Sequence, residues 1–366
     1  MFNNNIYLEV DGIRYEGFTD IAVNSAMENF SSFFSFTTTV EENKSSKLIN
    51  DIKEGQKAKV FMGQKARVFI DNILIITGFI EEIEKEASPS SKSKTASGRD
   101  IGGDIIDSDI IQKSYNQRNF ESLVNLVLKD NGFSIKVINK VGILNLEAKE
   151  TIKTELNQSI FNFLDQYAKK LQVLLKMDKN GNLNIIREDD EVVKNMLINN
   201  YTANTNILTS RLKLSTIDRF NVVEVYSQGN NKTHTKTGIS QKGRAVDPQI
   251  RSTRRKILTM DTASESKSLK ALAEWNIQVR KAKGSRYTCT TLGYYSSNNT
   301  LWQPNTLVDI IDYDMEVQGT FLIQGVTFHQ SLQGSFTNLD IVEQGSFSVG
   351  KINNLGNSFA DDLIIY

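Results

Sequence analysis

The spacing at which apolar residues recur changes twice along this 366-residue chain, and that change limits the possible folds more than any other feature. Polar and apolar residues alternate, as in β-strands, over about residues 6–86 and again over about 205–345. Between these regions, apolar residues recur every three to four positions, as in amphipathic helices, over about 99–200. The sequence therefore predicts two β regions that bracket an α+β insert.

The first β region consists of short runs separated by turn signals such as Asp11-Gly12. Strands are predicted over residues 6–10, 14–15, 30–40, 58–61, 66–70 and 73–81. Six short antiparallel strands at this spacing are typical of a barrel or a sandwich. The polar, Ser-rich run over 87–98 is predicted to be a long loop or a domain boundary.

The insert is predicted to contain two helices, each with a capping residue before its first turn. Asn119 and Ser159 are the predicted caps, because their short side chains can accept a hydrogen bond from a free backbone amide. A loop that contains Gly181 then predicts a β-hairpin directly after the second helix.

The second β region is predicted to hold one helix, over 264–283, and an extended, flexible excursion over 229–256. Its clearest strands are predicted over residues 286–293, 306–312, 319–328 and 335–342. The predicted domains are a first β-barrel over 1–97, an α+β insert over 98–204, a second β-barrel over 205–345 and a C-terminal tail over 346–366.

Composition excludes several classes of function. With 43 Lys+Arg against 43 Asp+Glu, the chain lacks the basic excess of a general nucleic-acid binder. Its single cysteine, Cys289, excludes an intramolecular disulfide and a Cys-based zinc site. The two histidines, His234 and His329, lie far apart in sequence. No stretch has the roughly 18 consecutive apolar residues of a membrane helix, and the first residues predict no secretion signal. We expect an intracellular protein without a cofactor.

The sequence contains no common catalytic motif. The phosphate-binding loop, the His-Glu-x-x-His motif and the Gly-x-Ser-x-Gly turn are all missing from the sequence. Two carboxylate clusters, 104–109 and 188–191, match no calcium loop, and the second is predicted to be a solvated helix start. Cys289 is predicted to be a core or strand-face thiol. The sequence therefore predicts a protein that is not an enzyme.

Two features are candidates for contacts with other molecules. The apolar stripe of the 264–283 helix is a candidate subunit interface, although packing on its own domain is an equal alternative; the stripe includes Leu272, Trp275 and Val279. The excursion carries eight basic residues against one acidic, and either contacts a partner or is a solvated loop. The basic candidates for a channel or partner contact are Lys242, Arg244, Arg251, Arg254 and Arg255.

Several segments, in order, resemble the Mu-type phage baseplate hub proteins. The most specific is Gly98-Arg-Asp-Ile-Gly-Gly-Asp-Ile-Ile-Asp-Ser108. The others are 6–17 with 23–34, 76–81, the helix over 159–171 with its Asp178-x-x-Gly-x-Leu183 hairpin, 273–275, 301–308 and 321–326. The resemblance covers about 6–345, and only 229–256 and the tail after Phe347 match nothing in the family. The family is similar in turn to the T4-type hub, the late control D proteins and the first half of the type VI secretion spike.

The resemblance implies a structural hub of a contractile phage tail or a tailocin, located in the virion baseplate and assembled in the host bacterial cytoplasm. It implies a homotrimer in which each subunit supplies two small tail-tube-like β-barrels. Six barrels in a pseudo-sixfold ring would join the threefold central spike to the sixfold tail tube. The implied partners are the tail tube protein, the spike protein, other baseplate proteins, and tape-measure protein or DNA in the channel. The alternatives are a type VI-like spike hub, a tail-associated cell-wall hydrolase and a carbohydrate-binding adhesin.

Overall fold

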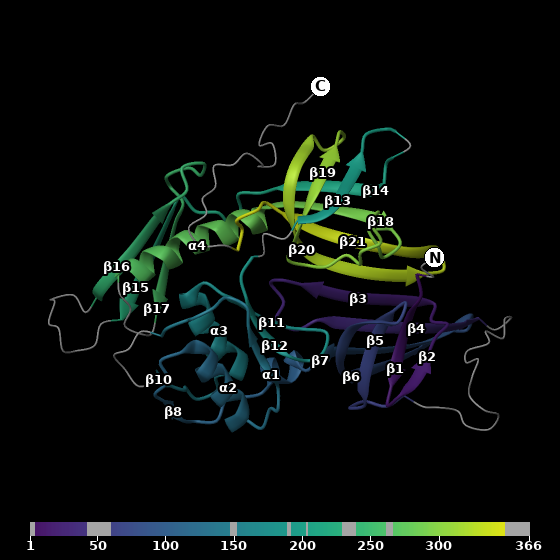
Figure 1. Cartoon of the computed structure of the whole chain (residues 1–366), viewed down its shortest axis with the longest axis horizontal. Coiled ribbons are helices and arrows are strands. Elements are labelled where there is room, and N and C mark those ends of the chain that lie inside the picture. Colours follow the sequence, from purple (N-terminus) through teal and green to yellow (C-terminus); the bar gives the residue numbers. More distant parts are fainter. Residues whose placement is uncertain are drawn as a thin grey trace.

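The computed structural model describes residues 4–41, 60–146, 152–188, 192–202, 204–228, 239–260 and 266–347. Figure 1 shows the second β region above the first, with the helical insert to the left of the first β region and a separate α/β unit at the left end. None of the helices within the described ranges is long and apolar enough to cross a membrane.

The first β region supplies seven strands to one large sheet. These are β1 (Ile6–Val10), β2 (Ile13–Tyr15), β3 (Asp20–Ala26), β4 (Phe33–Glu41), β5 (Lys65–Ile70), β6 (Ile73–Ala87) and β7 (Ser91–Asp100). They pair in the order β3-β4-β7-β6-β5-β1-β2. The strands predicted at 6–10, 66–70 and 73–81 are confirmed. The strand predicted at 58–61 is not, because residues 60 and 61 are not in a strand and residues 58 and 59 lie outside the described ranges.

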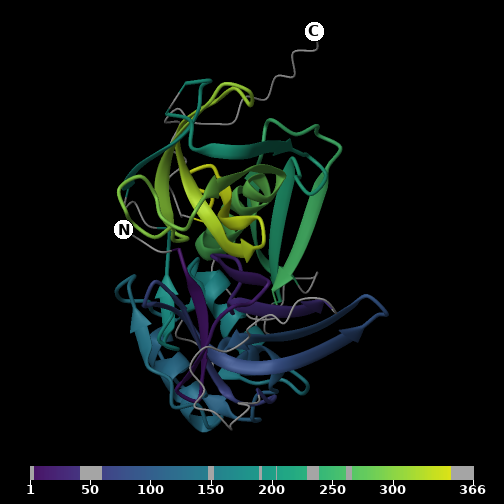
Figure 2. The ribbon, with the colours of Figure 1, turned by 90° about the vertical axis from the view of Figure 1, so that its right-hand side faces the viewer.

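The predicted loop over 87–98 is wrong, because most of it forms β7, which pairs with both β4 and β6. The strand was missed because its outer half is polar on both faces. Over residues 91–95 neither face of β7 enters the main core, and the β6–β7 hairpin stands out from the body of the molecule (Figure 2).

The second β region completes the same sheet. Its strands are β14 (Ile207–Leu214), β18 (Ser285–Leu292), β19 (Thr306–Asp312), β20 (Val317–Ser331) and β21 (Gly334–Val342). Strand β13 (Val192–Asn199), which lies within the range predicted for the insert, pairs with β19 and so belongs to this sheet as well. Strand β20 is 15 residues long and pairs with β19 and β21, while its C-terminal half also pairs with β3.

The pairing of β20 with β3 joins the two β regions into one thirteen-stranded sheet. The two regions also share one hydrophobic core, which includes Phe34 and Val68 from the first and Phe321 and Ile341 from the second. The expected pair of closed barrels is therefore not seen, because strand pairing forms no closed ring within the described residues.

The insert packs three helices and several short strands around a second core. Its elements are α1 (Gly102–Asp107), β8 (Ser114–Tyr115), α2 (Phe120–Asp130), β9 (Val137–Asn139), β10 (Ile152–Lys153), α3 (Ile160–Leu171), β11 (Leu174–Met177) and β12 (Leu183–Ile186). Both predicted caps are confirmed: Asn119 accepts from the amide of Ser122 and Ser159 from that of Asn162. The hairpin around Gly181 joins β11 to β12, as predicted.

A three-stranded sheet, which we call the third sheet, stands apart from the large sheet and from the small sheets of the insert at the left of Figure 1. It consists of β15 (Val222–Gln228) between β16 (Ile239–Val246) and β17 (Arg255–Met260), and α4 (Ser266–Gly284) covers one face. The predicted flexible excursion is thus wrong for the residues of β16 and β17, and residues 229–238 lie outside the described ranges. The helix itself is confirmed. Most of it packs on this sheet, and Ala282 near its C-terminal end packs against Leu307 and Leu322 of the large sheet.

Candidate functional site

The segment that carries the most specific resemblance, Gly98 to Ser108, joins the large sheet to the insert. Gly98, Arg99 and Asp100 are the last residues of strand β7, and helix α1 begins at Gly102. At Gly98 a Cβ atom would lie 1.9 Å from the carbonyl oxygen of Phe79, so only glycine fits the contact between β6 and β7. The segment therefore forms a short and rigid connection between the large sheet and the insert.

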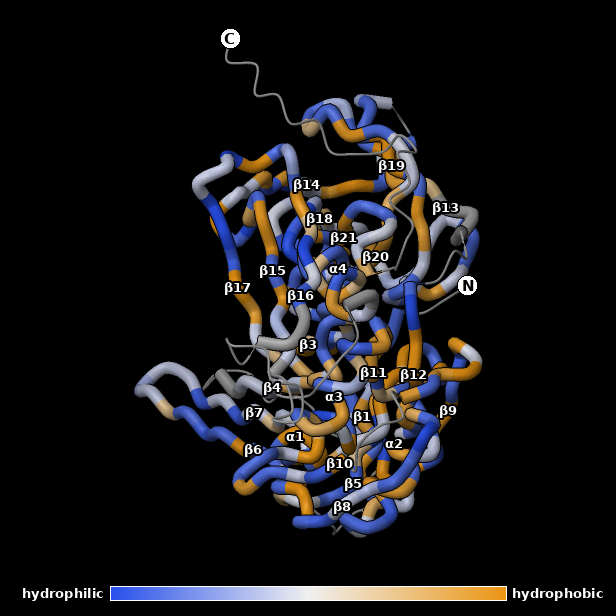
Figure 3. Tube along the Cα trace, turned by 90° about the vertical axis from the view of Figure 1, so that its left-hand side faces the viewer, coloured by the Kyte–Doolittle hydropathy of each residue, from blue (hydrophilic) through white to orange (hydrophobic). Residues whose placement is uncertain are grey.

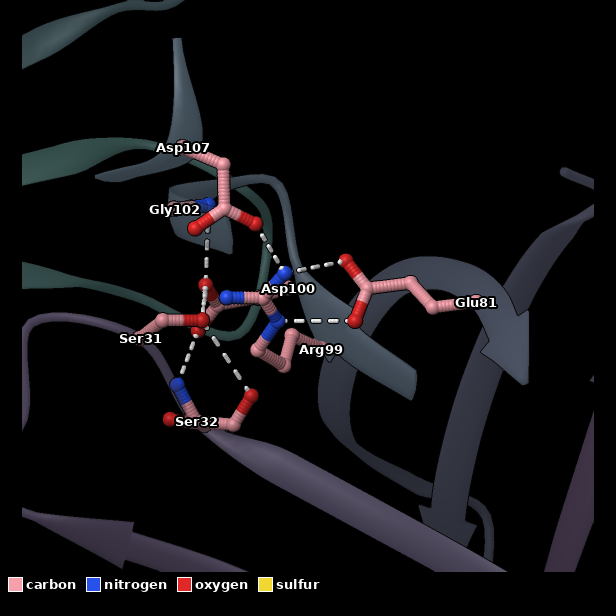
Figure 4. A network of polar contacts seen from close by, with 7 residues as sticks. All are labelled: Ser31, Ser32, Glu81, Arg99, Asp100, Gly102 and Asp107. Carbon is pink, nitrogen blue, oxygen red and sulfur yellow. Dashed lines mark hydrogen bonds and ion pairs between the residues drawn. The ribbon is translucent and has the colours of Figure 1, made fainter. Parts of the chain in front are cut away.

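Asp100 is the centre of this connection (Figure 4). Its carboxylate accepts hydrogen bonds from the amide of Ser32 (2.7 Å), the hydroxyl of Ser31 (2.7 Å) and the amide of Gly102 (2.9 Å). Burial raises the pKa of Asp100, against the opposing effect of these donors and of Lys176. A buried carboxylate with three donors fixes the start of β4, the end of β7 and the start of α1 relative to one another.

Lys176, on β11 of the insert, completes the buried network. Its ammonium group donates to the carbonyl of Asn29 (2.8 Å) and to the hydroxyl of Ser32 (3.3 Å). Burial lowers the pKa of Lys176 to about 8, although the charge of Asp100 acts in the opposite direction. Residues from the first β region and from the insert thus share one pair of buried charges.

The depressed pKa of Lys176 predicts a pH dependence of stability. Because the folded pKa, about 8, lies below the usual value of 10.5, the unfolded chain binds more protons between these values. Stability should therefore rise with pH in this window, by up to about 3 kcal/mol from this group. Urea unfolding of the wild type and of Lys176→Met between pH 7 and 10 measures the difference. A difference that stays constant with pH would contradict the assignment.

Next to this network, Arg99 lies on the outer side of the same connection. It binds the carboxylate of Glu81 (2.7 Å) and that of Asp107, and both hydrogen bonds raise its pKa. Burial, and then the charge of Glu81, raise the pKa of Asp104. The first carboxylate cluster of the sequence therefore serves this connection.

The second carboxylate cluster also has a structural role. The expected helix start at 188–191 is wrong, because a strand, β13, begins at Val192. Glu188 instead accepts hydrogen bonds from the amides of Gly345 (2.6 Å) and Phe347 (2.9 Å). It therefore fixes the position of residues 345–347, the last that the structure describes. Residues 189–191 lie outside the described ranges.

A cleft of about 720 Å³ lies where the insert meets both β regions. Its lining includes Lys176, Asn184, Glu188 and Trp302. Across the described ranges, no three His, Cys, Asp or Glu side chains come together as a metal site would require. Cys289 is buried in β18, and burial raises the pKa of its thiol, which confirms the prediction of a core residue.

The three residues of the predicted interface stripe are on the side of α4 that packs against its own chain. Leu272 and Trp275 are 9% and 8% exposed and pack in the core between α4 and the third sheet. Val279 is partly buried against the same core. This burial favours the alternative of local packing, and the outward side of α4 is the part that a neighbour can reach.

The five basic candidates lie in two places, on one face of the third sheet and in the connection before β17. Lys242, Arg244 and Arg255 are exposed, and the register places them on the face of the third sheet that points away from α4. Arg255 and Arg244 both approach the carboxylate of Glu224, and the hydrogen bond from Arg255 lowers the pKa of Glu224. Arg251 and Arg254 belong to the connection before β17.

The one acidic residue of the predicted excursion, Asp247, does not neutralise these cations. It forms a buried ion pair with Arg219 at 2.9 Å, and both side chains are less than a tenth exposed. Glu224, which the sequence reasoning missed, is the carboxylate that Arg244 and Arg255 approach. Its position on β15 gave no signal, because the pairing of β15 with β17 spans more than 30 residues of sequence.

Comparisons with known proteins confirm the resemblance to Mu-type baseplate hub proteins. Residues 5–100 match the family described as Mu phage baseplate assembly protein GpP-like, N-terminal. The chain is 21% identical to the baseplate hub protein gp44 of Escherichia phage Mu over 322 residues, which cover 84% of this chain and 79% of that protein.

Solved structures share the fold. The 43 kDa tail protein of prophage MuSo2 from Shewanella oneidensis has a TM-score of 0.78 at 23% identity, covering 94% of this chain and 99% of that one. The E. coli protein c3393 has a TM-score of 0.55 at 9% identity, covering 93% and 78%. That protein is described as a component of the type VI secretion system with structural similarity to the T4 bacteriophage tail proteins gp27 and gp5.

Proposed function

We propose that this chain is the structural baseplate hub of a contractile phage tail or of a phage-derived particle such as a tailocin. The observation that carries the proposal is the length of the likeness, since it covers 84% of this chain and 79% of the Mu hub protein rather than one shared domain. The role is non-enzymatic. The carboxylates that were candidates for catalysis bind other groups of the chain: Asp107 binds Arg99, and Glu188 accepts from the amide of Gly345.

The hub is a homotrimer that joins a threefold spike to a sixfold tail tube. Three copies with two β regions each offer six similar units around one axis, which is what a change of symmetry requires. The pairing of β3 with β20 supports this role, because it fixes the two β regions of one copy in a single sheet. The connection around Asp100 adds the insert to the same rigid body.

The partners of the hub are the tail tube protein, the central spike protein and other baseplate proteins. The exposed basic face of the third sheet, with Lys242, Arg244 and Arg255, is a surface for such a partner or for DNA or tape-measure protein in the channel. Helix α4 takes part in a subunit interface through its outward side, with Leu272 and Trp275 holding it to the third sheet. The location is the baseplate of the virion tail, after assembly in the host bacterial cytoplasm.

Native mass spectrometry of the purified chain tests the proposed assembly. We expect a dominant species near three times 41.2 kDa, and a ring in electron micrographs of the same sample. A stable dimer would contradict the proposal, because closed twofold symmetry cannot join a threefold spike to a sixfold tube. Adding a Mu-type tail tube protein should then give a larger complex.

The second candidate is the hub of a type VI-like secretion spike. The fold that is shared with c3393 favours it, at a TM-score of 0.55. Binding of the purified chain to a type VI tube protein, together with failure to bind a phage tail tube protein, would decide for this candidate.

A further inference from the structure

Three cationic side chains surround one aromatic ring at the edge of the third sheet. The ring of Phe220, just before β15, lies 5.4 Å from the guanidinium carbon of Arg254, 5.7 Å from the ammonium of Lys256 and 5.1 Å from the guanidinium carbon of Arg280. These residues come from the connection before β17, from β17 and from α4. We call this group the Phe220 cation site.

The charges of the site are not neutralised by carboxylates within the described part of the chain. Arg254 donates to the carbonyl of Ile217, and Arg280 donates to the carbonyl of Asp218 and to the side chain of Asn276. No ion pair forms at Arg254, Lys256 or Arg280 among the described residues. An aromatic ring face offsets only part of the mutual repulsion of three like charges. The site therefore fits an anionic partner.

A surface of opposite charge lies on the outer half of the hairpin formed by β6 and β7. Glu82, Glu84 and Glu86 alternate along β6 and are exposed. The register pairs them with Ser97, Thr95 and Ser93 of β7, whose neighbours on β4 are Ser35, Thr37 and Thr39. A hydrogen bond of 2.9 Å between the hydroxyls of Thr37 and Thr95 confirms that these two rows share a face.

The lysines of the hairpin lie on its other face. On β6, Lys85 lies between Glu84 and Glu86, so it is on the opposite face, where it pairs with Lys94 of β7. Lys92 lies two residues from Lys94 and therefore on the same face as Lys94. One face of the hairpin thus carries glutamates and hydroxyls, and we call it the acidic hairpin face. The other carries the lysines, and this separation makes the hairpin a two-sided element.

The Phe220 cation site and the acidic hairpin face are similar in size and lie in different parts of the molecule. The three cations lie within 5.7 Å of one ring centroid, so they are at most about 11 Å apart. Alternate residues on a strand are about 6.6 Å apart, so the three glutamates span about 13 Å. Figure 1 shows the third sheet at the left end of the long axis and strands β4 and β6 to the right of centre, and Figure 3 shows the hairpin standing out from the body.

We propose that the acidic hairpin face of one copy of the chain docks on the Phe220 cation site of the next copy. Two complementary surfaces in different parts of one molecule make a head-to-tail contact, which closes into a ring when the rotation between copies allows it. The contact rests on the proposed homotrimer and identifies the residues that hold its subunits together.

Charge reversal with native mass spectrometry and sedimentation tests the contact. Reversal of the hairpin (Glu82→Lys, Glu84→Lys, Glu86→Lys) or of the cation site (Arg254→Glu, Lys256→Glu, Arg280→Glu) should weaken self-association by at least about 100-fold. The chain that carries both sets should regain it. The matched control reverses the other hairpin face (Lys85→Glu, Lys92→Glu, Lys94→Glu) and should assemble like the wild type.

Carbodiimide cross-linking of the unmodified chain gives a second readout that does not depend on how the variants fold. In a mixture of ¹⁵N-labelled and unlabelled chains, we expect links from Glu82, Glu84 or Glu86 to Lys256 between copies. A wild-type trimer without these links, or one that survives either reversal, would overturn the contact and leave the trimer standing. A wild-type chain that stays monomeric at all concentrations would overturn the proposed assembly and the contact with it.

Discussion

Replacement of Asp100 by alanine is expected to lower the free energy of unfolding by about 3–5 kcal/mol. The substitution leaves the buried ammonium of Lys176 without its opposite charge. It also leaves the amides of Ser32 and Gly102 without their acceptor. Each buried donor without a partner costs about 1–3 kcal/mol, so the separate losses are consistent with this range.

Urea unfolding followed by circular dichroism measures the loss, and hydrogen exchange shows where it arises. The amides of Ser32 and Gly102 should lose protection in the variant before the rest of the large sheet does, because Asp100 is their acceptor. The matched control is Asp107→Ala, whose carboxylate is 59% exposed and binds Arg99 at the surface. It should cost less than about 1 kcal/mol.

A double variant separates the two causes. In the chain with Asp100→Ala and Lys176→Met, no unpaired charge remains buried, so the loss should be smaller than the sum of the single losses. Strict additivity would mean that the carboxylate and the ammonium do not interact through the fold, and would contradict the account of the connection.

Local signals in the sequence predicted the regular elements well. Helices α2 and α3 and the β11–β12 hairpin were predicted with their caps and turn, because each is specified by residues a few positions apart. Strand β7 was missed because neither face of its outer half packs against the main core. Its residues there do not alternate between polar and apolar, and this alternation is what predicts a strand.

Long-range pairing could not be predicted from the same signals. Strand β20 contacts β3 across about 300 residues of sequence, and this contact makes one sheet of the two expected barrels. The residues of the candidate sites show the same limit. The resemblance identified the segment around Asp100, but its partner Lys176 lies on another element and has no motif of its own. The Phe220 cation site likewise joins three elements.

Replacement of Gly243 by alanine is expected to displace helix α4 from the third sheet. At Gly243, on β16, an added Cβ atom would lie 2.1 Å from the carbonyl carbon of Leu269 and 2.2 Å from the backbone nitrogen of Lys270. Both are backbone atoms of the helix, so no side chain can turn away to make room. The helix must move as a whole, and the packing of Leu269 and Trp275 is lost with it. Overpacking of this kind costs about 1–3 kcal/mol or more.

The fluorescence of Trp275 measures this displacement in a Trp302→Phe background, in which Trp275 is the one remaining tryptophan. We expect a red shift of its emission and earlier unfolding of the third sheet and α4 in urea. Lys242→Ala is the control, because it changes the neighbouring residue of β16 on the opposite, exposed face. Unchanged emission in Gly243→Ala would contradict the close approach of helix and strand.

The same variant connects the fold of this unit to assembly. Arg280 lies on α4, whereas Phe220, Arg254 and Lys256 belong to the third sheet and its connections, so a shift of α4 takes one cation out of the Phe220 cation site. Gly243→Ala should therefore weaken self-association as well as stability, although the mutated residue lies outside both docking surfaces. If the displaced helix left self-association as strong as in the wild type, Arg280 would have no part in the contact.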